Sequence, residues 1–181
     1  LKLSGLQLGE NGNVQKLEIS GPPTYETWES CYDLLAVGLI MLDHISVHAS
    51  DKYKTRIKRY QQRYGSKLWP LVYQCDVRMR QERMTRIRRM AVEEHDEAIK
   101  AGGTHSFTPD KPWSYIFKKA SEDDTWWRNE LEEPAVLILA HIEKMGNVLD
   151  ESEPVDADHG FGRFSDSSRS TKRKAVDQGG T

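Results

Sequence analysis

Hydrophobic residues recur at steps of three and four positions over most of this chain, which is the spacing of one face of an α-helix. The expected helices span about 24–43, 50–64 (or from Ser46), 66–101, 112–120, from Asp123 or Asp124 onward, and 134–149. The pattern therefore predicts an all-α fold: an irregular domain of five or six helices organised around one long central helix.

The long central helix is predicted from Ser66, a good N-cap, to the two glycines that follow Ala101, and Pro70 falls in its first turn. Two apolar stripes run along it: Leu68, Val72, Cys75 and Met79, then Val77, Met84, Ile87, Ala91 and Ala98. At about 100° per residue the second stripe is rotated from the first by roughly a third of a turn. We therefore expect the two halves of this helix to pack on different partners.

The helix at 24–43 is the most hydrophobic of the set, and we expect it at the centre of the core. The residues expected to be buried are Trp28, Leu35, Leu39, Leu42, Tyr53, Ile57, Tyr60, Trp69, Val72, Cys75, Trp113, Phe117, Trp127, Leu137 and Ile138. Cys31 and Cys75, the two cysteines, lie in apolar periodic surroundings and are expected to be buried free thiols of a reducing compartment.

Both ends of the chain differ from the helical part, which is expected to form one domain over 22–149. Residues 1–21 alternate weakly and carry Asn11-Gly12, so they are either a flexible lead-in or a short hairpin. Residues 150–181 are rich in Asp, Glu, Ser and Gly and have few large aliphatic residues. That composition predicts a disordered tail or linker.

Charge is distributed unevenly along the 181 residues, although the net charge is only −2. The segment 52–89 carries 13 Lys and Arg residues against two acidic ones, while the remainder of the chain is acidic. Such a basic block indicates either a polyanion site or electrostatic complementarity between subunits.

The candidate nucleic-acid-binding residues are Lys54, Lys58, Arg59, Arg63, Arg78, Arg86 and Arg89. On an ideal helix the last three lie near each other, as a surface that contacts phosphates would require. The alternative is a solvated helix face with ion pairs at a spacing of four: Arg78–Glu82, Glu82–Arg86, Arg89–Glu93 and Asp96–Lys100.

Sequence signatures of catalysis are missing from the chain. It has no GxGxxG, P-loop, GxSxG or HExxH pattern, and no spacing of carboxylates picks out an acid–base pair. His44 and His48, with Asp43, would resemble a metal site on one helix, but Ser46 interrupts the helical pattern there. We therefore expect no enzyme activity, catalytic residue, metal, cofactor or small-molecule substrate.

The longest apolar run, 34–42, is too short to span a bilayer, and no signal peptide precedes it. An intracellular protein without membrane contact is expected, either cytoplasmic or nuclear. Lys172-Arg173-Lys174 is either a nuclear localisation patch or a solvated charge cluster.

One group of motifs resembles a known family. Gly21-Pro22-Pro23, Trp28, Arg63-Tyr64-Gly65, Trp69 and Tyr73-Gln74-x-Asp76-x-Arg78-x-Arg80 resemble the gag-like N-terminal region of protist retrotransposon polyproteins, over about 21–100. The resemblance implies a helical assembly module that self-associates, binds RNA or DNA weakly, and forms the first domain of a longer protein. The alternative is a sequence-tolerant DNA- or RNA-binding domain that uses the basic block 52–89.

Overall fold

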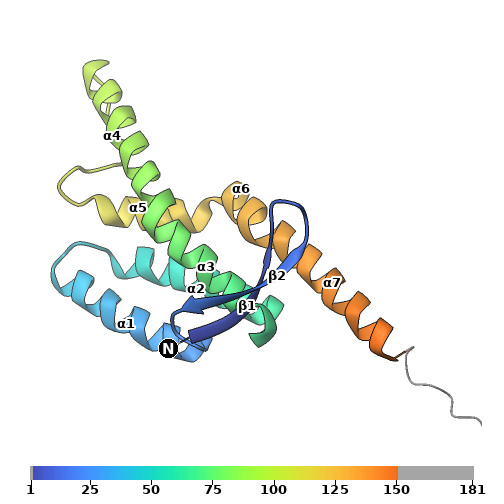
Figure 1. The fold of residues 1–181 in the computed structure, drawn as a ribbon. Helices are drawn as coiled ribbons and strands as arrows, with labels where there is room; N and C mark the ends of the chain where they lie inside the picture. Colours follow the sequence, from blue (N-terminus) through green and yellow to red (C-terminus); the bar gives the residue numbers. More distant parts are fainter. Residues whose placement is uncertain (1, 151–181) are drawn as a thin grey trace, which may run out of the picture.

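The computed structural model describes residues 2–150, which form five uninterrupted helices and one hairpin (Figure 1). The elements are β1 Lys2–Leu8, β2 Val14–Ser20, α1 Tyr25–Met41, α2 Val47–Tyr64, the 3-10 turn η1 Ser66–Leu68, α3 Trp69–Arg78, the π-helical turn η2 Met79–Arg83, α4 Met84–Lys100, α5 Pro112–Glu122, α6 Asp124–Trp127, the π-helical turn η3 Arg128–Glu132 and α7 Glu133–Asp150. Helices α3, η2 and α4 are continuous, and so are α6, η3 and α7. The predicted all-α class is confirmed. The tail predicted over 150–181 lies outside the described residues, apart from the last residue of α7.

The first twenty residues form the hairpin rather than a flexible lead-in. Strands β1 and β2 are antiparallel, with Leu8 opposite Val14 at the turn. The turn closes with a 2.8 Å hydrogen bond from the Gly9 N–H to the Asn13 carbonyl, and Gly12 takes a φ of 73°, which favours glycine. The hairpin lies on α3, and a Cβ at Gly5 would come within 2.4 Å of a Pro70 side-chain carbon. Glycine therefore allows the sheet to approach the helix this closely.

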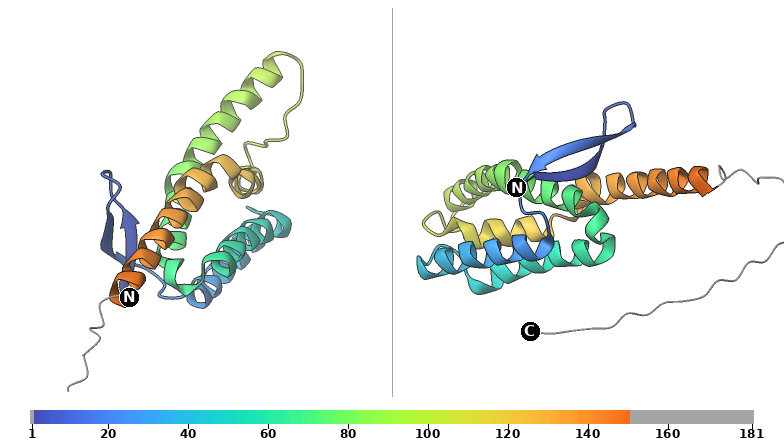
Figure 2. Two further views of the ribbon diagram at one scale, coloured as in Figure 1. Left: turned by 90° about the vertical axis from the view of Figure 1, so that its right-hand side faces the viewer. Right: turned by 60° about the horizontal axis from the view of Figure 1, so that its bottom comes forward.

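The long helix α3–η2–α4 runs through the middle of the molecule (Figure 2). On one side α2 packs on α1, α3 and α5, and on the other α7 contacts β1. The far end of α4 projects beyond the other helices (Figure 1). As expected, the two halves contact different elements, because α3 packs on the hairpin and α2 whereas α4 packs on α5.

The π-helical turn η2 removes the expected rotation between the two apolar stripes. Met79 and Met84 are five residues apart and both are buried, and Ile87 and Ala91 continue on the same buried face. A π turn holds one more residue than an α turn, so it rotates the following helix by about one residue step of 100°. The stripes that an ideal helix would separate therefore face the core together.

Most of the predicted core is confirmed by burial. The buried members are Trp28, Tyr53, Ile57, Tyr60, Trp69, Val72, Cys75, Phe117, Trp127 and Ile138. Leu39 and Trp113 are partly buried and pack against the core. The prediction is wrong for Leu35, Leu42 and Leu137, which are exposed.

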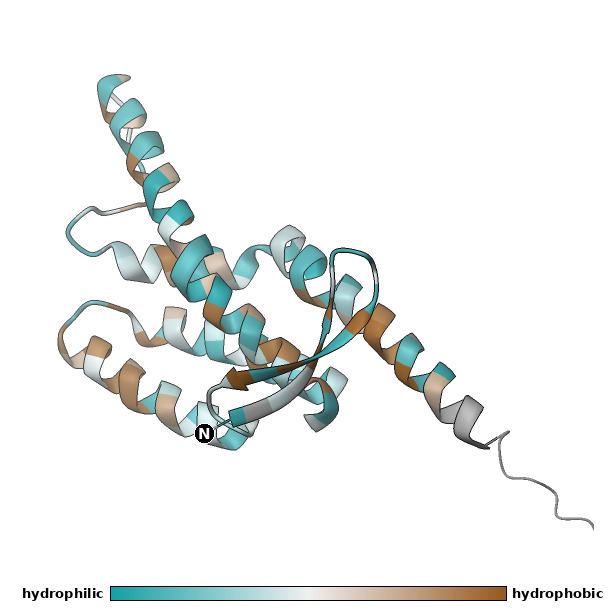
Figure 3. Ribbon diagram, in the orientation of Figure 1, coloured by the Kyte–Doolittle hydropathy of each residue, from teal (hydrophilic) through white to brown (hydrophobic). Residues whose placement is uncertain are grey.

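Helix α1 lies at the edge of the core, so its predicted central position is wrong. It buries only one face, made of Tyr25, Trp28, Tyr32 and Ala36. Its remaining apolar side chains point away from the core, and much of its ribbon is coloured as hydrophobic (Figure 3). Cys31 is exposed on this outer side, contrary to prediction. The helix is apolar around its circumference, and neighbours within the chain cover only part of it.

Candidate functional site

Acidic residues on other helices pair with most of the basic block 52–89. The ion pairs are Lys52–Glu122, Lys54–Asp33, Lys54–Glu29, Arg56–Asp124, Arg63–Glu132, Arg78–Glu130, Arg80–Asp76 and Arg83–Asp123. Only the Arg80–Asp76 pair has a spacing of four, and the four helical pairs expected from the sequence do not form among the described residues. The charge complementarity expected between subunits therefore operates within one chain.

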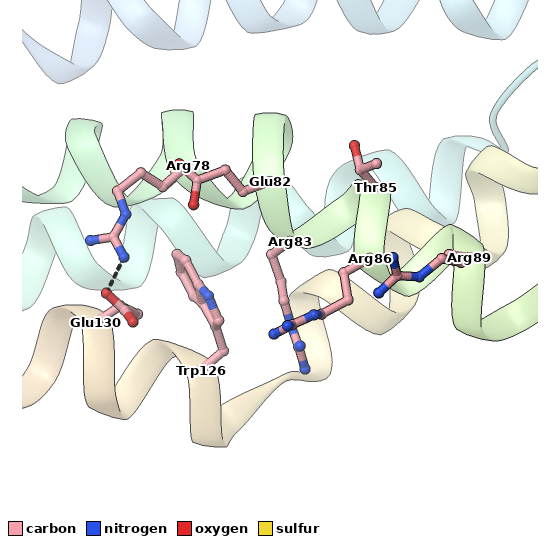
Figure 4. A pocket seen from close by; sticks show the side chains of 8 residues that line it. All are labelled: Arg78, Glu82, Arg83, Thr85, Arg86, Arg89, Trp126 and Glu130. Atoms are coloured by element: carbon pink, nitrogen blue, oxygen red, sulfur yellow. Dashed lines mark hydrogen bonds and ion pairs between the residues drawn. The ribbon is translucent and has the colours of Figure 1, made fainter.

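Arginines gather where the long helix passes α6 and η3. A cleft of about 540 Å³ opens there, lined by Arg78, Glu82, Arg83, Thr85, Arg86, Arg89, Trp126 and Glu130 (Figure 4). We call it the arginine cleft. Four arginines and two glutamates line it, so its walls carry a positive surplus.

The two π-helical turns meet at the arginine cleft. Arg78 and Arg83 are five residues apart across η2, which brings both side chains to the same side of the long helix. Glu130 comes from η3, the π turn of the facing helix. The irregular turns thus set which charged side chains face each other, and π turns are frequent at functional sites.

Two of the four arginines are neutralised by acidic partners. Arg78 donates from Nη2 to Glu130, and Arg83 donates from Nε to Asp123 Oδ2 at 2.7 Å. Both pairs bridge the long helix to the α6–η3 segment, across 52 and 40 residues of sequence. They are partly exposed and should each contribute less than about 1 kcal/mol to stability. Their main effect is to hold the two walls in a defined position.

Arg86 and Arg89 are exposed and form no ion pair with any of the residues described here. They follow η2 on α4, three residues apart, and both line the arginine cleft. A guanidinium group has five donors in a planar fork that matches a phosphate. These two side chains are therefore the ones in the cleft that are available to an anion.

Trp126 supplies an aromatic wall beside the guanidinium groups. Its side chain rises between the Arg78–Glu130 pair and the guanidinium groups of Arg83 and Arg86 (Figure 4). It is half-buried and packs edge-on against Trp127, with ring centroids 4.9 Å apart. Trp127 is in turn fixed by a 2.8 Å hydrogen bond from its Nε1 to the Ala120 carbonyl. The exposed part of this braced ring is suited to stacking with another flat group.

Of the seven candidate residues, the structure brings together only Arg78, Arg86 and Arg89. Lys54 binds Asp33 at 2.7 Å, and Arg63 pairs with Glu132 at 3.6 Å. Lys58 and Arg59 are exposed on α2, away from the arginine cleft, and form no ion pair with the described residues. The predicted set is thus divided between one cleft, two structural pairs and two separate surface cations.

Sequence reasoning missed Arg83 and Trp126. Arg83 was assigned near the second apolar stripe because an ideal helix has no π turn, and the five-residue step from Met79 to Met84 was the available signal. Trp126 lies 37 positions or more from every arginine of the cleft, and no local pattern connects them.

The groups considered for metal binding are not assembled. His44 lies in the loop after α1 and His48 in the first turn of α2, so their spacing of four does not place them on one helix. Asp43 instead forms an ion pair with Lys111. Residues 2–150 contain no group of three or more His, Cys, Asp or Glu side chains that could hold a metal ion.

Over the same residues, every helix is too short or too polar to cross a membrane. Comparison of the chain with protein-family models, curated proteins and solved structures gave no match. The site is therefore interpreted from its own geometry and from the sequence.

Proposed function

We propose that this chain is a helical assembly module of the retroelement gag-like class, which self-associates and binds nucleic acid weakly. The observation that carries self-association is the apolar surface that a well-formed core leaves uncovered. On α1 the exposed fractions of Leu34 and Met41 are 77% and 81%, and on α7 that of Val136 is 57%. Large exposed apolar patches on a folded protein commonly mark contacts with other molecules. The motif resemblance over 21–100 points to the same class of protein.

Self-association without nucleic acid is the test of this function. Sedimentation velocity of the full chain, at concentrations from about 5 to 200 µM, should show a sedimentation coefficient that rises with concentration. The range covers the micromolar affinities expected of small, transient interfaces. A single monomeric species at every concentration would remove the assembly function.

Nucleic-acid binding is the second function that we propose, and the arginine cleft is the observation that favours it. Arg86 and Arg89 have no acidic partner among the described residues, and Trp126 stands beside them. Cationic side chains that follow a phosphate backbone, next to an aromatic ring that stacks on bases, are the usual means of sequence-tolerant single-strand binding. Acidic partners neutralise most of the remaining basic block, so the cleft supports this activity better than the whole block 52–89 does.

The test compares two double variants that remove the same charge. Arg86→Gln with Arg89→Gln should lower the affinity for a labelled single-stranded oligonucleotide of about 20 nucleotides. The log–log salt slope should also fall by roughly 1.4–1.8, because each lost phosphate contact removes about 0.7–0.9. Lys58→Gln with Arg59→Gln, on exposed α2 positions, is the matched control and should leave the slope nearly unchanged.

Two other outcomes have defined meanings. Equal losses in both double variants would favour the alternative, a diffuse binding surface over the block 52–89. A loss in the α2 variant alone would exclude the arginine cleft as the binding site. Circular dichroism should be unchanged in both variants, since glutamine has a helix propensity close to those of arginine and lysine.

A further inference from the structure

One face of α1 is apolar, exposed and free of charge. It consists of Cys31, Leu34, Leu35, Gly38, Met41 and Leu42, and we call it the α1 outer face. Its four large side chains have exposed fractions of 77% for Leu34, 45% for Leu35, 81% for Met41 and 67% for Leu42. The opposite side of the helix is already buried in the core. The described part of the chain therefore leaves this face uncovered.

The spacing along the α1 outer face is that of a helix–helix seam. From Cys31 the apolar positions advance by three or four residues to Leu34 and Leu35, then to Gly38, then to Met41 and Leu42. Alternating steps of three and four keep one seam facing a neighbouring helix. A Cβ built at Gly38 would meet no atom within 4 Å, so the middle of the seam is open. A helix backbone can approach closely there, and large side chains lie on both sides of the gap.

The charges around the α1 outer face exclude anionic ligands. Helix α1 contains no lysine or arginine, and its charged residues, Glu26, Glu29 and Asp33, are all acidic. Lys54 of α2 pairs with Asp33 and Glu29 on the flank of the helix. Nucleic acid and anionic lipid headgroups would be repelled rather than attracted. An uncharged apolar helix is the surface that fits this face.

We propose that the α1 outer face docks against the same face of a second copy of this chain. The proposal rests on the proposed self-association and names its surface. The exposed fractions correspond to apolar surface on the order of 500–600 Å² per chain, the upper end for patches on monomers. Pairing two copies would bury on the order of 1,000 Å², the lower limit for a specific interface. The face is compatible with itself because each copy presents both large side chains and the open Gly38 position.

The experiment uses two matched double variants of the full chain. Leu34→Glu with Met41→Glu places charges on the α1 outer face, and Val136→Glu with Leu137→Glu places the same charges on the exposed part of α7. All four positions are exposed, so circular dichroism and the melting temperature should remain near those of the parent chain. In sedimentation velocity, the α1 variant should be monomeric where the parent chain and the α7 variant form dimers.

The outcomes separate this inference from the function on which it rests. If the parent chain dimerises and the α1 variant still does, the surface is wrong and self-association survives. If only the α7 variant becomes monomeric, the interface lies on α7 and the inference is overturned. If the parent chain is monomeric at every concentration, both the function and the inference fall.

Cys31 provides a second readout on the same face. It is exposed, whereas Cys75 is buried and serves as the internal control. The alkylation rate of Cys31 should fall in proportion to the dimer fraction in the parent chain and the α7 variant, and stay constant in the α1 variant. A Cys31 rate that is independent of concentration in a dimerising chain would place the interface elsewhere.

Discussion

Trp28 Nε1 donates a 2.9 Å hydrogen bond to Asp76 Oδ2, joining α1 to α3 across 48 positions of sequence. The Asp76 carboxylate is fully buried and also accepts from the Tyr53 hydroxyl at 2.8 Å and from Arg80 Nε at 3.1 Å. Burial, and next the charge of Asp76, raise the pKa of Tyr53 well above its ordinary value, so this hydroxyl remains a donor. One carboxylate thus holds three helices together.

Asp76→Asn should destabilise the fold by about 3–5 kcal/mol. The substitution leaves the partly buried Arg80 without its counter-charge and directs an amide N–H₂ at groups that are themselves donors. Urea denaturation monitored by circular dichroism measures the loss. The control is Asp124→Asn, which breaks an exposed pair with Arg56 and should cost less than about 1 kcal/mol. Similar losses in both variants would show that the buried network has no special role.

Deleting Gln81 should be strongly destabilising although this residue is exposed. The deletion shortens the π turn η2 to an α turn and rotates α4 by about 100° against α3. Met84 and Ile87 would leave the core, and burial of each such side chain is worth about 1.5–3 kcal/mol. We expect a loss above about 3 kcal/mol in chemical denaturation.

The matched control for this deletion is Gln81→Ala. It keeps the length of the turn and should change stability by less than about 0.5 kcal/mol. A deletion variant as stable as the parent chain would mean that α4 repacks without the π turn.

The two thiols should differ sharply in reactivity. Burial raises the pKa of the Cys75 thiol to about 12, and its Sγ lies 3.1 Å from the Glu130 carbonyl oxygen, to which it donates. At about pH 8 a thiol reagent should therefore modify one cysteine per native chain and two per chain in denaturant. Mass spectrometry counts the adducts, and Cys31→Ser should abolish the native one. Rapid modification of Cys75 in the native chain would indicate local opening between α3 and η3.

Trp126→Leu should weaken single-strand binding without changing its salt dependence, if the arginine cleft binds as proposed. Loss of one stacked base costs about 1–3 kcal/mol, which is on the order of tenfold or more in affinity. No charge is removed, so the log–log salt slope should stay the same. Fluorescence anisotropy with a labelled oligonucleotide measures both quantities. Trp113→Leu is the control, because this partly buried tryptophan does not line the cleft. An unchanged affinity in Trp126→Leu would exclude stacking at this wall.

Local pattern was sufficient for the fold class and for much of the core. The three- and four-residue spacing placed α2 and its buried Tyr53, Ile57 and Tyr60 correctly, because those residues form a single stripe on a helix that is otherwise polar. Asn11-Gly12 indicated the hairpin as one of two alternatives. Helical periodicity also placed Arg78, Arg86 and Arg89 near each other, and they do line one cleft.

The sequence by itself thus determined the features that depend on neighbouring residues in the chain: helix positions, stop signals and the polar or apolar character of each face. The tertiary structure decided the features that depend on distant residues. Which side of α1 is buried, which acids pair with the basic block, and whether Trp126 joins the arginines all follow from packing across 40 residues or more. The π turn η2 belongs to the same class, because the register of a helix follows the surfaces it must cover on both halves. Local spacing sets the faces of each helix, but only the assembled core selects which of those faces it covers.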